Sequence, residues 1–271
     1  MMTVHRLRLV AWHVFKESVR DRVLYSIVAF AVILVAASWV IGQITAGQDV
    51  KIIKDLGLAT IEVAGIVMSV FIGVGLVSHE IERRSIYSVL AKPLPRWEFI
   101  VGKYLGLMLT VVVNVALMTA AFYVLLAWMG WAAPEYARRS WESPAADPKL
   151  LLAVALIVGE LALLTAVALF FSTFSSSALI SIVFTLGLWV AGIESQDLRH
   201  FGDLVDSPMT ALVTAVGWMI PAFSVFDVKS AIVHGHSVPI GVVAWRLLYA
   251  LVYSAVTVGA SVAIFSRREF K

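Results

Sequence analysis

Six apolar runs, each near the length that crosses a lipid bilayer, constrain the fold of this chain more than any other feature. A helix of about 20 apolar residues spans the ~30 Å of hydrocarbon, and inside lipid a helix satisfies its own backbone hydrogen bonds. We therefore expect an all-α fold, a polytopic membrane helical bundle that forms a single transmembrane domain over residues 1–271. The six expected spans are residues 23–44, 58–78, 99–131, 150–172, 178–193 and 240–266.

The composition excludes the main classes of soluble protein. Hydrophobic residues make up 61% of the chain and charged residues 14%, against about 25% charged residues in an ordinary soluble domain. The mean hydropathy is +0.91. This balance excludes a soluble enzyme, a disordered chain and a nucleic-acid-binding domain, so we expect no nucleic-acid partner. The chain has no cysteine and therefore no disulfide framework or thiolate site.

A seventh apolar stretch, residues 209–226, is interpreted through the distribution of positive charge. With six spans and both termini cytoplasmic, most Lys and Arg residues fall on the cytoplasmic side, as the positive-inside rule requires. A seventh span would place Arg267 and Arg268 outside. We therefore expect 209–226 to be an external re-entrant or interfacial hairpin of a multi-pass protein in the inner (plasma) membrane. Gly217 and Pro221 are its gate candidates.

The first 22 residues predict an amphipathic helix that lies on the cytoplasmic membrane surface, in contact with membrane lipid. Val4, Leu7, Ala11 and Val14 share one helical face, and charged residues take much of the other face, which is typical of an interfacial helix. The alternative is a cytoplasmic extension of the first span.

Three polar side chains within the expected spans are candidates for an intramembrane functional site. Glu160 and Asn114 lie inside the fourth and third spans. An ionisable group at the bilayer centre costs about 2.5–3.5 kcal/mol, so Glu160 should face the bundle or a wet cavity. There it would line the substrate path, carry a proton or make a structural hydrogen bond between helices. Glu62 lies near the outer end of the second span, where we expect it to be exposed at the membrane interface.

Residues 80–98, between the second and third expected spans, predict a short cytoplasmic helix suited to docking on a soluble partner. Ile86, Val89 and Leu90 have the i, i+3, i+4 spacing of one helical face. Acidic residues in its first turn suit the helix dipole, and Pro93 ends the helix. A helix joined rigidly to two spans would transmit a movement into the bilayer. The alternative is a solvated linker.

The same segment resembles the ABC-2 type permeases, in particular the membrane subunits linked to nitrous-oxide reductase maturation and gliding motility. The residues that carry the resemblance are Glu82, Ser85, Val89-Leu90, Pro93-Leu94-x-Arg96-x-Glu98, Gly102-Lys103 and the upstream Phe15-Lys16-Glu17-Ser18-x-Arg20-Asp21. The resemblance implies a dimer with a second permease copy or a paralogue, and a separate ABC ATPase subunit on the cytoplasmic side. That subunit would bind ATP and Mg²⁺.

On this resemblance, the segment 80–98 is a coupling helix, and the chain itself is not an enzyme. The residues expected to couple to the ATPase are Glu80, Glu82, Arg83, Arg84, Ser85, Tyr87, Leu90, Pro93, Arg96 and Glu98, and those of the interface helix are Lys16, Glu17 and Arg20. A phosphate-binding loop needs Gly-x-x-x-x-Gly-Lys-Ser/Thr, whereas Gly102-Lys103 is followed by Tyr104. If ATP drives this protein, it must therefore bind to another chain.

His234-Gly235-His236, with Asp227, offers two imidazoles and a carboxylate that could bind zinc or copper. Because the spacing provides no further ligand, we expect neither a metal site nor any cofactor bound by this chain.

Two other functions fit a polytopic membrane protein. A non-transporting anchor or scaffold would tolerate the loss of Glu160 and charge reversal at Glu82. An integral-membrane lipid-modifying enzyme would need catalytic residues on one membrane face, and the sequence contains no convincing nucleophile–base set. We therefore expect the permease subunit of an ABC exporter.

Overall fold

The computed structural model describes residues 2–20, 22–44, 49–82, 95–175, 177–195, 217 and 220–267. All regular structure within these ranges is helical, which confirms the predicted all-α class. The helices are α1 (Met2–Val19), α2 (Arg22–Ile44), α3 (Asp49–Glu82), α5 (Arg96–Ala132), α6 (Glu135–Ser140), α7 (Leu150–Phe174), α8 (Ala178–Ile193), the 3₁₀ helix η1 (Ser224–Phe226), α11 (Lys229–Val233) and α12 (Ile240–Arg267).

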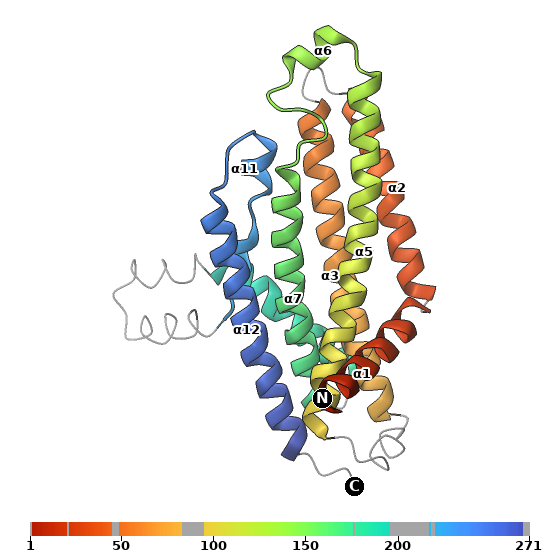
Figure 1. Cartoon of the computed structure of the whole chain (residues 1–271), viewed down its shortest axis with the longest axis vertical. Helices are drawn as coiled ribbons and strands as arrows, with labels where there is room; N and C mark the ends of the chain where they lie inside the picture. Colours follow the sequence, from red (N-terminus) through yellow and green to blue (C-terminus); the bar gives the residue numbers. More distant parts are fainter. Residues whose placement is uncertain are drawn as a thin grey trace, which may run out of the picture.

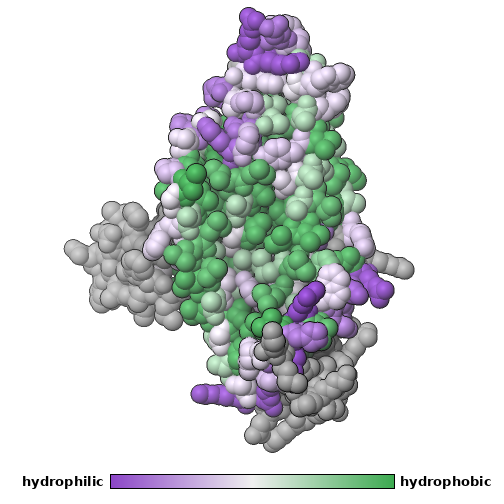
Figure 2. Space-filling model, viewed as in Figure 1, coloured by the Kyte–Doolittle hydropathy of each residue, from purple (hydrophilic) through white to green (hydrophobic). Residues whose placement is uncertain are grey.

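The long helices lie side by side and define two ends of the bundle (Figure 1). One end carries α1 and the last turn of α12 and is called the α1 end. The opposite end carries α6 and is called the α6 end. Hydrophobic residues form a continuous band over the helices between these ends, and hydrophilic residues gather at both of them (Figure 2). This pattern is that of a protein surrounded by lipid around its middle.

Helix α7 forms the centre of the bundle. It packs against α3, α5, α8 and α12. In its most apolar stretch of 18 residues 72% is buried, against 22% in the corresponding stretch of α12. Leu156, Leu161 and Leu164 of α7 are fully buried. Helix α12 is therefore peripheral, and most of its surface is open to lipid.

Among the residues that the structure describes, four helices are long and apolar enough to cross a membrane, namely α3 over Val50–Gly75, α5, α7 and α12. Helix α8 has only 16 residues, a length of about 24 Å, and the apolar part found in α2 is Ile27–Ala37. All six expected spans are helical, five of them at close to their expected bounds, and the six-span topology itself stays a prediction. Of the predicted hairpin 209–226, only Gly217 and residues 220–226 lie in the described part of the chain.

Helix α3 is longer than the sequence pattern indicated, at both ends. It begins at Asp49 rather than at 58 and continues through the expected break at 79 to Glu82. The early start is possible because Lys54, which is 1% exposed, donates hydrogen bonds to Ser143 Oγ (2.8 Å) and to the carbonyl of Pro144 (2.7 Å). These bonds satisfy the ammonium group of Lys54, which lies before the expected start of the span at residue 58.

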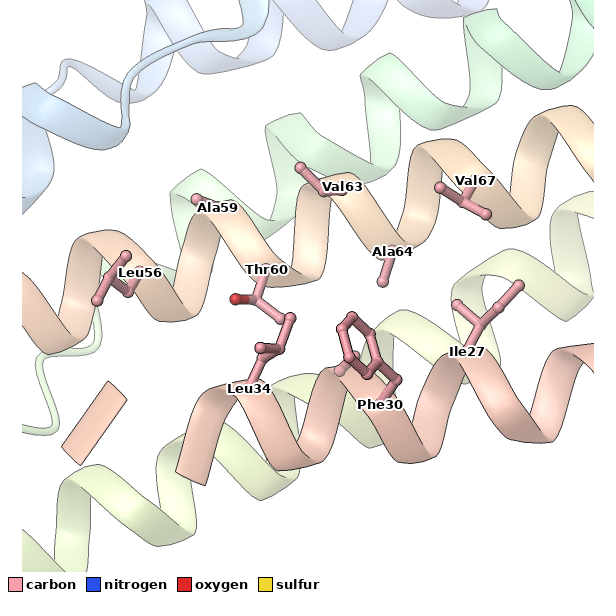
Figure 3. A pocket seen from close by; sticks show the side chains of 10 residues that line it. Ile27, Phe30, Leu34, Leu56, Ala59, Thr60, Val63, Ala64 and Val67 are labelled. Carbon is pink, nitrogen blue, oxygen red and sulfur yellow. The ribbon is translucent and has the colours of Figure 1, made fainter. Parts of the chain in front are cut away.

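An apolar groove of about 530 Å³ separates α2 from α3. Phe30 and Leu34 of α2 lie opposite Thr60 and Ala64 of α3 across this groove (Figure 3). Helices α2 and α3 also pack directly against each other, so the groove does not part them completely.

Helix α1 lies across the first turns of α5, and two glycines of α5 permit this close crossing. A Cβ atom at Gly106 would lie 2.6 Å from the carbonyl oxygen of Ala11 and 2.7 Å from Val14 Cβ, and one at Gly102 would lie 2.7 Å from Val10 Cγ1. The Gly-x-x-x-Gly spacing therefore serves close helix packing, and Val10, Ala11 and Val14 hold α1 on α5 at this crossing.

We expect Gly106→Val to push α1 away from α5 and to lower the apparent melting temperature of the purified protein. Overpacking a tight contact costs about 1–3 kcal/mol. Gly259→Val in α12 is the matched control, because nothing lies within 4 Å of a Cβ at Gly259. Equal melting temperatures for the two variants would contradict the role of Gly106.

A second prediction concerns the loop that follows α6. Lys51 Nζ lies 2.7 Å from Glu142 Oε1, and this hydrogen bond, with the charge of Lys51, lowers the pKa of Glu142 below its ordinary value. A carboxylate with a lowered pKa in the folded state stabilises the fold above its unfolded-state pKa and loses that contribution as the pH falls through the folded-state pKa.

The difference in melting temperature between wild type and Lys51→Gln should therefore be largest at neutral pH and disappear towards about pH 3. Lys149→Gln, which removes the same charge from the loop that contains Glu142, serves as the control. A difference that does not change with pH would show that Lys51 acts without Glu142.

Candidate functional site

A partly buried polar cluster lies between the helices and consists of Glu62, Glu160, Trp189 and Lys229. Lys229 Nζ forms a salt bridge with Glu62 Oε2, and the two side chains are 20% and 14% exposed. Trp189 Nε1 donates a hydrogen bond of 3.0 Å to Glu160 Oε1. The carboxyl groups of Glu160 and Glu62 also contact each other. Four elements, α3, α7, α8 and α11, thus meet at one polar site.

Local packing brings the two carboxyl groups together. Helices α3 and α7 approach closely because Gly65, one turn beyond Glu62, faces the side chain of Leu161, the residue after Glu160. Helix α11 packs on both α3 and α7, and Lys229 is its first residue. The backbone N–H of Lys229 donates to Asp227 Oδ1 at 3.1 Å, which orients the start of α11 towards α3.

The cluster contains two carboxyl groups and a single ammonium group. Away from water an unpaired charge costs several kcal/mol, about 3–5 kcal/mol when one partner of a buried pair is removed. Lys229 therefore compensates charge that α3 and α7 carry into the bundle. Because Lys229 belongs to a different segment from either helix, its position decides whether that charge is compensated.

The structure confirms one expectation for these side chains and corrects another. Glu160, 4% exposed, faces the bundle as predicted. The interfacial exposure expected for Glu62 is wrong, because the apolar span of α3 begins at Val50 and places Glu62 in its middle. Asn114 is buried, but its Nδ2 donates to the carbonyl of Thr110 in the same helix (2.7 Å) and takes no part in the cluster.

The sequence patterns did not identify Lys229 and Trp189 as members of this site. Lys229 follows a polar loop, and Trp189 lies near the end of an apolar run, where tryptophan is common in membrane proteins. Neither has a spacing that relates it to Glu62 or Glu160, since all four residues come from different helices. Only the packing of α8 and α11 on α3 and α7 brings them together.

The segment between α8 and α12 is tied to both neighbours. The N–H of Phe223 donates to the carbonyl of Gly192 at the end of α8 (3.0 Å), and the N–H of Ala222 donates to the Tyr249 hydroxyl of α12 (3.0 Å). Pro221 and Gly217 are both buried. Their proposed role as a gate stays a prediction, but the described part of the segment is bonded to the end of α8 and to Tyr249 in the third turn of α12.

At the α1 end, the first turn of α5 is tied to the last turn of α12. Arg96 Nη1 donates to the carbonyl oxygens of Ser266 (2.8 Å) and Phe265 (3.4 Å), where helix carbonyls lack partners within the helix. Glu98 is 2% exposed, and its Oε2 has no hydrogen-bond partner among the described residues. Lys103, also 2% exposed, lies with Nζ 4.8 Å above the ring of Phe99.

The other predicted coupling residues are only partly described. Glu80 and Glu82 belong to the last turn of α3, and Arg83, Arg84, Ser85, Tyr87, Leu90 and Pro93 lie outside the described residues. The interface-helix residues Lys16, Glu17 and Arg20 are exposed. Lys16 Nζ lies 5.4 Å from the ring centroid of Trp12.

Within the described ranges, no group of three or more His, Cys, Asp or Glu side chains could hold a metal ion. The Nδ1 atom of His234 lies 2.8 Å from the carbonyl of Ser230, which occupies one of its two ring nitrogens.

A scan against protein families matches the model described as "ABC-2 family transporter protein" over residues 8–194. The chain belongs to the ABC-2 transporter family. The match covers well over half of the 271 residues and extends from α1 to the end of α8. It includes Glu62, Glu160 and Trp189 and ends before Lys229. A search of curated proteins gave no match.

Family membership and the apolar helices together make the chain a multi-pass permease subunit of an ABC transporter. The resemblance seen around residues 15–21 and 80–103 is thereby confirmed at the level of the family. The described structure adds the polar cluster to the permease.

Replacing Lys229 by Met should destabilise the permease, by less than the about 3–5 kcal/mol of a fully buried pair, because it leaves the partly buried carboxylate of Glu62 without its ammonium partner. The double variant Lys229→Met/Glu62→Gln should recover much of that loss. A double-mutant cycle on the apparent melting temperature in detergent measures both effects.

The control is the exposed pair Arg139–Glu135 on α6, whose side chains are 78% and 79% exposed. Loss of such a pair costs about 1 kcal/mol or less. If Arg139→Met and Lys229→Met had equal effects, the Glu62–Lys229 pair would not be a partly buried charge pair.

Proposed function

We propose that this permease is the membrane subunit of an ABC exporter and works as a dimer with a second copy or a paralogue. A separate ATPase subunit binds ATP and Mg²⁺ and docks at the α1 end, where residues 80–98 act as the coupling helix. Both termini are cytoplasmic, so the α6 end is external. The family match supports this proposal, as does the absence of a phosphate-binding loop motif from the sequence.

The observation that carries the proposal is that one continuous helix connects the coupling segment to the polar cluster. Helix α3 runs from Glu82, at the start of that segment, back to Glu62, about 30 Å away at 1.5 Å per residue. A displacement of the coupling segment by the ATPase moves α3 as a rigid rod. It thereby changes the position of Glu62 relative to Lys229.

Two contacts spread the same displacement to other helices. Arg96, at the other end of the coupling segment, holds the last turn of α12 through the carbonyls of Phe265 and Ser266. Helix α1 follows α5 because it packs on Gly102 and Gly106. The coupling segment therefore acts on α3 and α5 directly, and on α12 and α1 through them.

At the α6 end, the segment 220–233 closes the path in the resting state. Its closed position is held by the Glu62–Lys229 salt bridge and by the hydrogen bonds of Phe223 and Ala222. When α3 moves, the salt bridge separates and the segment can leave the ends of α8 and α12. This assigns the external gate to residues around Gly217 and Pro221, as the sequence predicted.

The test is co-purification of the permease in mild detergent, followed by an ATPase assay of what it retains. We expect a stoichiometric ATP-binding subunit that is lost on charge reversal by Glu82→Lys together with Arg83→Glu. Arg139→Glu, a charge reversal on α6 at the opposite end, should leave the complex intact. A chain that purifies alone and binds no ATPase from its own cells would overturn the proposal.

Transport then distinguishes a permease from an anchor. In vesicles reconstituted with the ATPase subunit, the variant Lys229→Met/Glu62→Gln should still hydrolyse ATP. Its ATP hydrolysis should be less tightly coupled to transport than that of the wild type, because the gate no longer has its charge pair. Unchanged coupling in this variant would remove the polar cluster from the mechanism and favour a scaffold role.

A further inference from the structure

We propose that the cleft between α1 and α5 binds one anionic phospholipid, with the headgroup phosphate on Arg8 and His5 and an acyl chain along Leu9 and Leu109. The cleft has a volume of about 590 Å³ and is lined by His5, Arg8, Leu9, Ala11, Trp12 and Leu109. That volume lies within the range of small-molecule sites, about 300–1,000 Å³. The inference does not depend on the ATPase partner or on the direction of transport.

Helix packing shapes the cleft. Val10, Ala11 and Val14 of α1 press against Gly102 and Gly106 of α5, and Val14 is 4% exposed. Residues 5, 8, 9 and 12 follow one another at helical spacing beside this contact face. Because α1 is fixed on α5 by its neighbouring face, the lining residues are held in place without a ligand.

The lining combines a basic edge with an apolar wall, and this combination matches a phospholipid. Leu9 is 55% exposed, Trp12 49% and Leu109 39%, although Leu109 belongs to the membrane-spanning part of α5. In a bilayer, such side chains contact hydrocarbon, whereas Arg8 and His5 require polar partners. Tryptophan is enriched at the depth where headgroups meet acyl chains. Trp12 therefore sets the level of the cleft at that boundary.

The charge of α1 selects an anionic headgroup. The lining residues described for the cleft include no carboxylate. Helix α1 carries Arg6, Arg8 and Lys16, against the single carboxylate of Glu17. Juxtamembrane basic residues attract anionic lipids, and a guanidinium can bind phosphate oxygens in a bidentate manner. A zwitterionic lipid offers the same phosphate with a compensating positive charge, so it should bind more weakly.

The experiment measures the apparent melting temperature of the full-length permease in detergent as phosphatidylglycerol or phosphatidylcholine is added. A ligand that binds the folded state raises the melting temperature. We expect phosphatidylglycerol to raise it in a saturable way and phosphatidylcholine to have little effect. Arg8→Gln should require about fivefold more phosphatidylglycerol for half of the shift.

Arg6→Gln is the matched control, because it removes the same charge from the same helix at a position outside the cleft lining. It should respond to phosphatidylglycerol like the wild type. If Arg8→Gln does not fold, Arg8→Lys and His5→Gln give the same comparison, with smaller losses. Equal responses of the Arg6 and Arg8 variants, or equal effects of the two lipids on the wild type, would overturn the proposal.

Discussion

The close contact between α3 and α7 is the constraint on which the rest of the bundle depends. Gly65 lets the two helices approach, and this approach brings Glu62 and Glu160 together inside the hydrocarbon layer. Two carboxyl groups at that depth require compensation, which Trp189 and Lys229 provide. The positions of α8 and α11 thus follow from the packing of the two central helices.

Much of this arrangement could be predicted from hydropathy alone. The apolar runs placed α5, α7, α8 and α12 close to their observed ends, because a backbone that crosses lipid must satisfy its own hydrogen bonds, as a helix does. The start of α3 was missed for a physical reason. Lys54 looks like an outer-loop residue until the loop containing Ser143 and Pro144 provides its acceptors, and that loop is distant in sequence.

The candidate site was predictable only in part, for a similar reason. A carboxyl group within an apolar run must face protein, which identified Glu160 correctly. Its partners could not be inferred, because a pairing between helices leaves no spacing in the sequence. Gly102 and Gly106 show the opposite case, in which a sequence spacing does mark a contact between helices. Their Gly-x-x-x-Gly spacing arises easily by chance, but here it lies where α1 crosses α5.

The hydrogen bonds of Arg96 have a consequence for how the protein is made. The chain emerges from the ribosome in order, and the carbonyl acceptors of Arg96 belong to Phe265 and Ser266. The first turn of α5 therefore waits for about 170 further residues to be made, including α7, α8 and most of α12, before its guanidinium meets these acceptors. Completion of this end of the permease thus coincides with insertion of the last helix, and a prematurely terminated chain leaves Arg96 without these two acceptors.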